Sequence, residues 1–262
     1  MTLIQVIVVE MKRQTFLRVV SIVLLVAAQA KVLAQDSGTS LEIELGSVWQ
    51  DRNKVQIPND LMGDRFQLTD IAGTGPWASA RVNLNWDLEG PHGLRVVLAP
   101  LSYEETGLLP DDTRFAGGSF LSSQPVTAEY KFNSWRFGYR YQFHERDQWK
   151  FWIGATAKIR DAKIELNQSG INAIDDDVGF VPLLYLAGDY QIDSRWSFRF
   201  DFDGLAGGPG RAFDLSLKLG YELNEDWRLS AGYRTLEGGV DNDDVYNFAW
   251  LNTALVSLEY RF

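Results

Sequence analysis

The sequence contains no cysteine and only two histidines, His92 and His144. A chain without cysteine has no disulfide framework and cannot be anchored through a lipid-modified cysteine. Positive charge is also in deficit, because the formal net charge is −10, and this argues against nucleic acid as a partner. Beyond residue 34 no run of about 18 apolar residues occurs, so no helical membrane span is expected there.

The N-terminal segment has the layout of a secretory signal peptide. A basic start at residues 11–13 precedes an apolar run from Phe16 to Ala30, and small residues continue to Ala34. That order is typical of an exported protein, and the run is shorter than the roughly 20 apolar residues of a spanning helix. We expect residues 1–34 to be the signal peptide, with cleavage after Ala30 as an alternative, and residues 35–262 to be the mature domain. Met11 is a better initiator than Met1.

Two-residue alternation of apolar and polar side chains repeats along the mature chain. Residues 227–235 place Trp, Leu, Ala and Tyr on one face and Arg, Ser, Gly and Arg on the other. Period two indicates β-strands with unlike faces. A change of phase between Phe132 and Trp135 predicts a β-bulge near Asn133. Ten strands are predicted, at 40–50, 76–88, 94–103, 126–143, 149–165, 179–192, 196–203, 212–223, 227–236 and 248–262.

The predicted connections alternate between tight turns and longer loops, and both chain ends lie on the side of the tight turns. Three of the four tight turns are followed at once by tryptophan, at Trp149, Trp196 and Trp227, and the last strand ends on Phe262. This pattern resembles the bacterial outer-membrane β-barrel proteins, which have short periplasmic turns and long external loops. The resemblance covers the signal peptide, the strand rhythm and the last strand, and it points to no narrower family.

The resemblance implies an all-β fold, an antiparallel up-and-down barrel of about ten strands in the outer membrane of a Gram-negative bacterium. It also implies outer-membrane lipid and lipopolysaccharide as surroundings, and barrel assembly machinery that recognises the strand ending at Phe262. No cofactor is expected. The competing fold is a soluble barrel or sandwich with its apolar face inward. The aromatic residues at strand ends and the unequal loops favour the membrane.

If the apolar face meets lipid, charged side chains occupy the lumen. Barrels of about eight strands are filled by their own side chains, whereas those of about 16–18 strands leave a channel. The charges therefore either pair into a rigid polar core or line a narrow pore. The candidate lumen-lining residues are Arg81, Asp87, Arg95, Arg136, Arg140, Lys158, Arg199, Asp201, Asp214, Lys218, Arg234 and Glu259, with Glu42, Glu44, Asp189, Asp203 and Glu222 as further inward carboxylates.

The predicted external loops are acidic and partly apolar. Loops 51–75, 104–125, 166–178, 204–211 and 237–247 carry fifteen Asp and Glu against five Lys and Arg. Their densest clusters are either solvated loops or sites for divalent cations that also bind lipopolysaccharide. The second interpretation is considered because clustered oxygen ligands suit hard cations. Residues 63–76 either pack on themselves or cover the barrel mouth as a plug. The acidic loop residues singled out are Asp175, Asp176, Asp177, Asp241, Asp243 and Asp244.

An enzyme is the third class of function to consider. Known ten-stranded barrel enzymes, the omptin proteases, use aspartates and a histidine in an external cleft, and outer-membrane lipid hydrolases use histidine, usually with serine. Both histidines of this chain fall in predicted periplasmic turns, on the opposite side. We therefore expect no catalytic, cofactor or metal residues. The predicted function is a non-enzymatic structural or surface-interaction role, with a narrow porin-like channel as the alternative and an enzyme acting on lipid or peptide as the least favoured.

Overall fold

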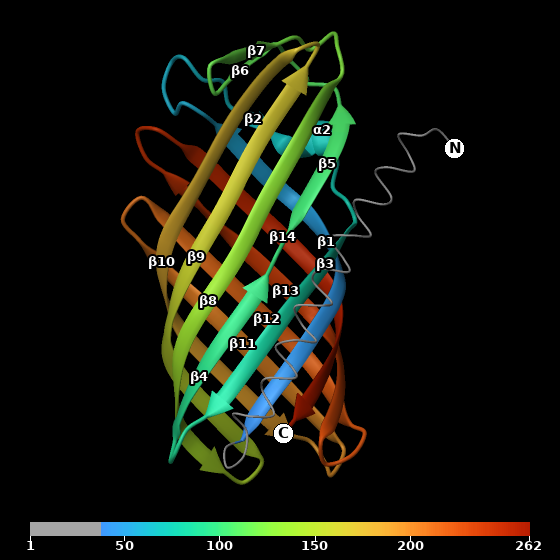
Figure 1. Cartoon of the computed structure of the whole chain (residues 1–262), viewed down its shortest axis with the longest axis vertical. Helices are drawn as coiled ribbons and strands as arrows, with labels where there is room; N and C mark the ends of the chain where they lie inside the picture. The colour runs from blue at the N-terminus through green and yellow to red at the C-terminus, as the bar shows by residue number, and fades with distance from the viewer. Residues whose placement is uncertain (1–37) are drawn as a thin grey trace, which may run out of the picture.

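The computed structural model describes residues 38–262, so the predicted signal peptide at 1–34 lies outside the described residues. Ten antiparallel strands form one closed barrel (Figure 1). Each strand pairs with the next along the chain, and β1 closes the barrel by pairing with β14. The strands are β1 (Thr39–Gln56), β3 (Trp77–Asp87), β4 (His92–Ala99) continued by β5 (Ser102–Gly107), β8 (Val126–Arg146), β9 (Trp149–Gln168), β10 (Ile171–Gln191), β11 (Trp196–Gly207), β12 (Gly210–Glu222), β13 (Trp227–Asp241) and β14 (Tyr246–Arg261).

The ten predicted strands are confirmed, but several of them run further than predicted. The predicted loop at 166–178 is wrong, because β9 continues to Gln168 and β10 begins at Ile171 after the two residues Ser169 and Gly170. The loop at 204–211 is likewise reduced to two residues between β11 and β12. Ser169, Gly170 and Gly208 have positive φ, which tight hairpin turns of this kind require.

The predicted bulge near Asn133 is also wrong. The β8–β9 register runs without interruption from Thr127, opposite Asn167, to Gln142, opposite Trp152. The same alternate residues of β8 face inward along the whole strand, but they change from apolar near the loop end to polar deeper in the barrel. Val126, Ala128 and Tyr130 are buried beside the loops, and Ser134 and Arg136 are buried deeper in the barrel.

The two ends of the barrel differ. One end carries both ends of the described chain and only short turns, and we call it the turn end. The other carries three short hairpins and the two long connections, residues 57–76 and 108–125, and we call it the loop end. At the turn end, cross-strand Trp–Tyr pairs form an aromatic belt on the outer surface of β9 to β14. Their ring centroids lie 4.6 Å apart for Trp149–Tyr190, 4.9 Å for Trp196–Tyr221 and 4.7 Å for Trp227–Tyr260. This belt corresponds to part of the aromatic girdle of membrane barrels.

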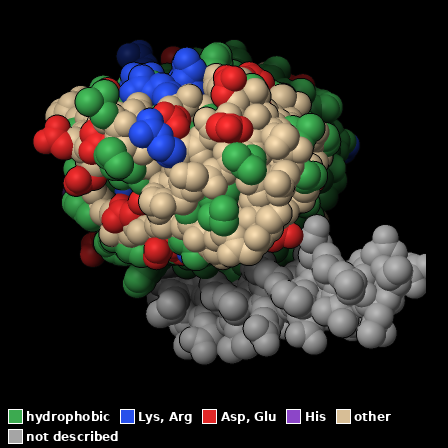
Figure 2. Space-filling model, turned by 90° about the horizontal axis from the view of Figure 1, so that it is seen from above, with side chains coloured by type: hydrophobic (Ala, Val, Ile, Leu, Met, Phe, Trp, Pro, Cys, Tyr) green, Lys and Arg blue, Asp and Glu red, His purple; other side chains and the backbone are tan. Residues whose placement is uncertain are grey.

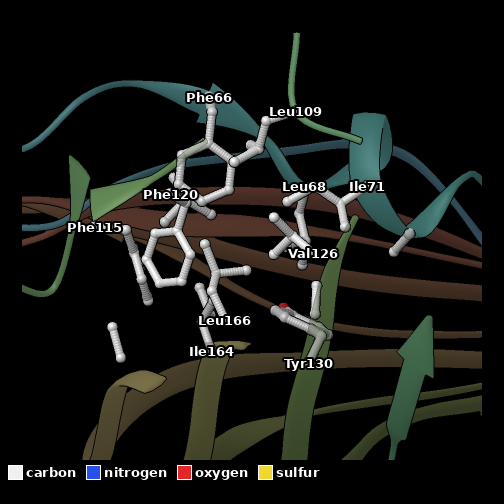
Figure 3. Packing of buried hydrophobic residues seen from close by; sticks show 14 of the residues in the cluster. Phe66, Leu68, Ile71, Leu109, Phe115, Phe120, Val126, Tyr130, Ile164 and Leu166 are labelled. Carbon is white, nitrogen blue, oxygen red and sulfur yellow. The ribbon is translucent and has the colours of Figure 1, made fainter. Parts of the chain in front are cut away.

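The loop end is covered by an apolar plug. It consists of β2 (Phe66–Gln67), α2 (Leu68–Ala72) and the hairpin of β6 (Thr113–Phe115) and β7 (Gly118–Phe120). Phe66, Leu109, Phe115 and Phe120 pack onto inward residues of β8 and β9, including Leu166 (Figure 3). Seen from above the loop end, atoms cover the mouth (Figure 2). Of the two interpretations of residues 63–76, the structure shows the plug.

Outward faces are apolar around the middle of the barrel and polar near the loop end. On β9 the outward side chains run from Trp149 to Ile159 and are then replaced by Asp161, Lys163 and Glu165. Inward side chains change in the opposite sense, from charged to apolar. The extension of β8 and β9 is therefore built like a soluble barrel, with an apolar core inside. Within residues 38–262, no helix is long and apolar enough to cross a membrane.

Candidate functional site

The centre of the lumen is closed by arginine–carboxylate pairs around Asp214. The Asp214 carboxylate accepts hydrogen bonds from Arg81 at 2.8 Å, Arg136 at 2.5 Å and Arg234 at 2.7 Å. Arg234 comes from β13, the neighbour of the Asp214 strand β12, whereas Arg81 of β3 and Arg136 of β8 reach Asp214 from across the lumen. All four residues are buried. Arginine suits this arrangement because its fork of donors serves two carboxylates at once.

A second carboxylate, Asp203, joins the same cluster from β11. It accepts hydrogen bonds from Arg95 at 2.9 and 3.0 Å, from Arg136 at 2.7 Å and from the Thr156 hydroxyl at 2.6 Å. Arg136 thus bridges Asp203 and Asp214. The Arg95 guanidinium also lies 3.9 Å from the centre of the Tyr185 ring, whose hydroxyl donates to Asp201 at 2.8 Å.

A third group of charges ties β12 and β13 to β1. The Lys218 ammonium donates to Glu42 at 2.7 Å and to Glu44 at 3.1 Å, and Arg234 donates to Glu44 at 2.9 Å. Because Arg234 also binds Asp214, this group is continuous with the central cluster. A charged side chain at this depth is costly unless it is paired. The network therefore forms a contiguous polar layer across the barrel.

Below this layer the lumen widens toward the turn end. Arg199 pairs with Asp189 at 3.1 Å and with Glu259 at 3.0 Å, and Arg140 pairs with Asp87. These side chains line a cavity of about 740 Å³ that reaches the turn-end residues Gln148, Ser194 and Asn224. We call this cavity the vestibule.

Of the twelve lumen-lining candidates, the structure places all twelve inside the barrel and pairs eleven of them with opposite charge. Lys158 of β9 is the exception. It is 3% exposed, and among the described residues no carboxylate lies within ion-pair distance of its ammonium. Its ammonium instead lies 4.8 Å from the centre of the Phe132 ring. Lys158 faces Arg136 directly across the β8–β9 pair, and like charges in that position repel.

The acidic residues of the predicted loops are dispersed rather than gathered. Asp175, Asp176 and Asp177 lie within strand β10, opposite Ile164, Lys163 and Ala162 of β9. Asp177 pairs with Arg160. Burial, with Asp177 and Asp176 nearby, raises the pKa of Asp175.

The second acidic group lies where β13 meets β14. Asp241 ends β13 and accepts a hydrogen bond from Asn59 at 2.9 Å, whereas Asp243 and Asp244 lie in the turn. Across residues 38–262, no three His, Cys, Asp or Glu side chains are placed to hold a metal ion.

The plug is attached to the barrel wall by contacts that the sequence pattern does not reveal. Gln50 donates to the backbone oxygen of Gly73 at 2.7 Å and accepts from the Tyr103 hydroxyl at 2.7 Å. Burial raises the pKa of Tyr103 far above its usual range, so its hydroxyl remains a donor. The only sequence signal is a polar residue, Gln50, on an inward position of β1 near the loop end.

An ion pair also joins the two long connections to each other. Arg114, from the β6–β7 hairpin, donates to the Asp64 carboxylate through its side chain at 2.6 and 3.0 Å and through its backbone N–H at 2.9 Å. The hydrogen bond from the Arg114 side chain, followed by the one from its backbone, lowers the pKa of Asp64 to about 2. The plug is thus fastened on its exposed side as well as beneath.

Both histidines lie at the turn end, at strand ends rather than in the turns as predicted. His92 begins β4, and its Nδ1 lies 2.6 Å from the Tyr139 hydroxyl. His144 lies in β8 beside the ring of Phe151. Both are exposed and far in the fold from the plug. The structure brings neither histidine together with the central carboxylates.

Solved structures of outer-membrane proteins resemble this fold. The Escherichia coli outer-membrane protease OmpT has 10% sequence identity and a TM-score of 0.51, and the alignment covers 86% of this chain and 97% of OmpT. Neisserial surface protein A has 11% identity and a TM-score of 0.36, with 86% and 97% covered. AlkL, solved in lipid bilayers, has 9% identity and a TM-score of 0.42, with 87% and 92% covered. Neither a family model nor a curated protein matches the sequence.

At these identities the likeness concerns the fold alone. The likeness to OmpT agrees with the closed ten-stranded barrel. The apolar outward band and the aromatic residues at the turn end are those of a membrane barrel. In such proteins the short turns and the termini face the periplasm and the long loops face outward, so the loop end is external. This chain is a β-barrel protein of the Gram-negative outer membrane.

Proposed function

We propose that this barrel does not conduct solutes and that it acts through its external end, in a structural or surface-interaction role. The observation that carries the proposal is a lumen closed twice in series. The ion-pair layer around Asp214 closes its middle, and the plug around Phe115 and Phe120 closes its external mouth. The vestibule thus opens toward the periplasm and ends at the charged layer.

The central layer is costly to open. Removing one partner from a buried ion pair costs roughly 3–5 kcal/mol, because the other charge is left without compensation. Asp214 alone has three arginine partners on three strands, and one of them, Arg136, also holds Asp203. A path for solutes would require several such pairs to separate together. A fixed polar core that stiffens the barrel is the simpler account of these contacts.

The external extension offers a surface for contact with other molecules. The outward faces of β8 and β9 carry a ladder of charges, with Lys131–Asp161 at 2.6 Å and Lys163–Glu129 at 2.7 Å. At the tip of the first long connection, Leu61 is 92% exposed and Met62 is 67% exposed. Two such apolar side chains within an acidic surface suit a partner that presents basic groups around an apolar contact.

An enzyme is less well supported. A general base must lie within hydrogen-bond reach of the group from which it takes a proton. Both histidines lie at the periplasmic end, and the carboxylates at the centre are engaged by arginine. We therefore infer that the chain has no catalytic role.

Single-channel recording in a planar bilayer tests the proposal. The mature chain, refolded and shown to be folded by heat-modifiable migration, is expected to give a silent bilayer, while a porin prepared in the same way gives discrete steps. Reproducible conductance steps from the folded chain would overturn the proposal and favour a channel. A variant lacking the β6–β7 hairpin is the matched control. It should remain silent, because the central ion-pair layer still closes the lumen.

A further inference from the structure

A second cavity lies in the barrel above the ion-pair layer, and it is largely apolar. Its volume is about 410 Å³, within the usual range of small-molecule sites, about 300–1,000 Å³. Its walls include Val181, Leu183, Leu205, Ala212 and Val240, and its floor is formed by Asp203, Asp214, Arg136 and Lys158. We call this cavity the chamber. The charged layer separates it from the periplasmic vestibule.

The chamber adjoins a gap in the barrel wall. Strand β10 pairs with β11 only as far as Leu184, opposite Gly204, although β11 continues to Gly207 and β10 extends to Ile171. In Figure 1 the β9–β10 hairpin reaches the top of the molecule, whereas the β11–β12 hairpin ends well below it. Pro182 lies on this unpaired edge, where a residue without an N–H donor is tolerated.

Both edges of the gap line the chamber. Phe180, Val181 and Pro182 contribute from β10, and Leu205 and Gly207 contribute from β11. The opening therefore lies in the side of the barrel rather than at its plugged mouth.

The outward side chains of β9 and β10 show where the gap lies relative to the membrane. Phe180 faces outward, is 64% exposed and pairs with Ile159, the last apolar outward residue of β9. The next outward pair, Val178 with Asp161, already joins the polar extension. The gap thus lies where the apolar band ends, at the level of the outer leaflet. A molecule that partitions into that leaflet meets the chamber from the side.

Lys158 gives the chamber its chemical preference. It is the lumen candidate without an ion-pair partner among the described residues, it is 3% exposed, and its side chain lines the chamber floor. Arg136 directly opposite adds positive charge, which its own partners Asp203 and Asp214 offset. An unpaired buried ammonium beside apolar walls is compensated best by an anion that brings its own apolar body.

We propose that the chamber is a binding site for a monoanionic amphiphile, a molecule with one carboxylate and an apolar chain. It enters through the gap between β10 and β11, and its carboxylate pairs with Lys158. Its chain lies along Val181, Leu183 and Leu205. This inference stands apart from the proposed function, since a closed lumen neither requires nor excludes a lateral site.

Decanoate with a ¹³C-labelled carboxyl group is a suitable probe, with the protein in lipid nanodiscs so that detergent does not fill the chamber. Saturable binding is expected, at least tenfold tighter than that of decanol. In Lys158→Met the preference for decanoate over decanol should disappear. The matched control is Lys131→Met, which removes the same charge from the outer face of the neighbouring strand and should leave the preference intact.

Filling the chamber tests the apolar part of the site. Ala212→Phe is expected to abolish saturable binding of both probes, and Val240→Phe serves as a second variant if the first does not fold by heat-modifiable migration. Non-saturable uptake of decanoate, equal in the wild type and in Lys158→Met, would overturn the proposal. Saturable binding that persists in Lys158→Met with its preference unchanged would also overturn it. Neither result bears on conductance, so the two proposals fail separately.

Discussion

Arg136 and Lys158 lie directly opposite each other on β8 and β9 with both side chains inside the barrel, yet only Arg136 has carboxylate partners. Replacing the two residues should therefore affect the free energy of unfolding differently. Arg136→Met should lower the free energy of unfolding by about 3 kcal/mol, because Asp203 and Asp214 each lose a partner but keep others. Lys158→Met should leave stability within about 1 kcal/mol of the wild type or raise it, because an uncompensated buried charge is removed.

Urea unfolding in lipid vesicles, followed by tryptophan fluorescence, measures both free energies. An equal loss of unfolding free energy in the two variants would contradict this prediction, because it would show that Lys158 also has a stabilising partner in the lumen.

Replacing Asp214 should lower the free energy of unfolding more than replacing any one of the arginines around it. Asp214→Asn leaves Arg81, Arg136 and Arg234 with one negative charge fewer in a buried layer, and a loss of about 3–5 kcal/mol is expected. Asp161→Asn is the matched control. Its pair with Lys131 is partly exposed on the outer face, and such pairs contribute about 1 kcal/mol or less. A comparable loss in both variants would argue against a central polar core.

The plug should depend on its aromatic residues. Phe120 is 1% exposed and packs within the cluster that covers the barrel mouth. Phe120→Ala is expected to cost about 3–5 kcal/mol of local stability, and it should appear as faster protease cleavage within residues 108–125 while the barrel stays heat-modifiable. Leu61→Ala at the exposed tip is the control and should leave the cleavage rate unchanged. Unchanged cleavage in Phe120→Ala would mean that the plug does not depend on this packing.

The strand count and the membrane barrel were predictable because a half-buried strand imposes period two on its own sequence, as in residues 227–235. What failed was the interpretation of the external extension. Above Asp161 the outward face becomes polar and the inward face apolar, so the same alternation appears with its phase reversed. At Asn133 this reversal imitates a bulge. In residues 171–178 the alternation is lost, because Asp175 and Asp177 take inward positions while Ile174 and Val178 are exposed, and this segment therefore imitates an acidic loop.

The lumen charges could be assigned from alternation alone, but their pairing could not. Asp214 meets Arg81 and Arg136 across 133 and 78 positions of sequence, and only the closure of the barrel brings these residues together. For the same reason the absence of a partner at Lys158 leaves no trace in the sequence. The chamber depends on where β10 stops pairing with β11, and Pro182 is the only local signal of that edge.

The ion pair between the two long connections should persist in moderately acidic solution. Hydrogen bonds from Arg114 lower the pKa of Asp64 to about 2, whereas an unperturbed aspartate titrates near 3.9. Because the pKa is lower in the folded state, the ion pair contributes its full stabilisation when the pH is above the unfolded-state pKa. That stabilisation is lost as the pH falls through the folded-state pKa. Between about pH 4 and pH 2 the pair should therefore weaken progressively.

The titration of Asp64, followed by NMR of its carboxyl carbon, measures this directly. A midpoint near 2 is expected in the wild type, and it should rise toward the unperturbed value in Arg114→Gln. A wild-type midpoint equal to that of the variant would show that the two connections are not joined through this pair.

The last residue of the chain should matter more for assembly in cells than for stability. The Phe262 backbone N–H donates to the Thr39 oxygen at 2.9 Å where β14 meets β1, and its ring contacts Tyr260 at 4.8 Å between centroids. One aromatic contact at the periplasmic rim adds little to a barrel already closed by sixteen register pairs between β1 and β14. If the strand ending at Phe262 is also the signal read by the assembly machinery, Phe262→Ala should reduce heat-modifiable barrel in outer-membrane fractions. Its urea midpoint after refolding in vitro should stay unchanged.

Trp250→Ala removes an outward aromatic from the external end of the same strand and should assemble normally. Equal loss in both variants, or a lowered midpoint in Phe262→Ala, would attribute the effect to stability rather than to recognition.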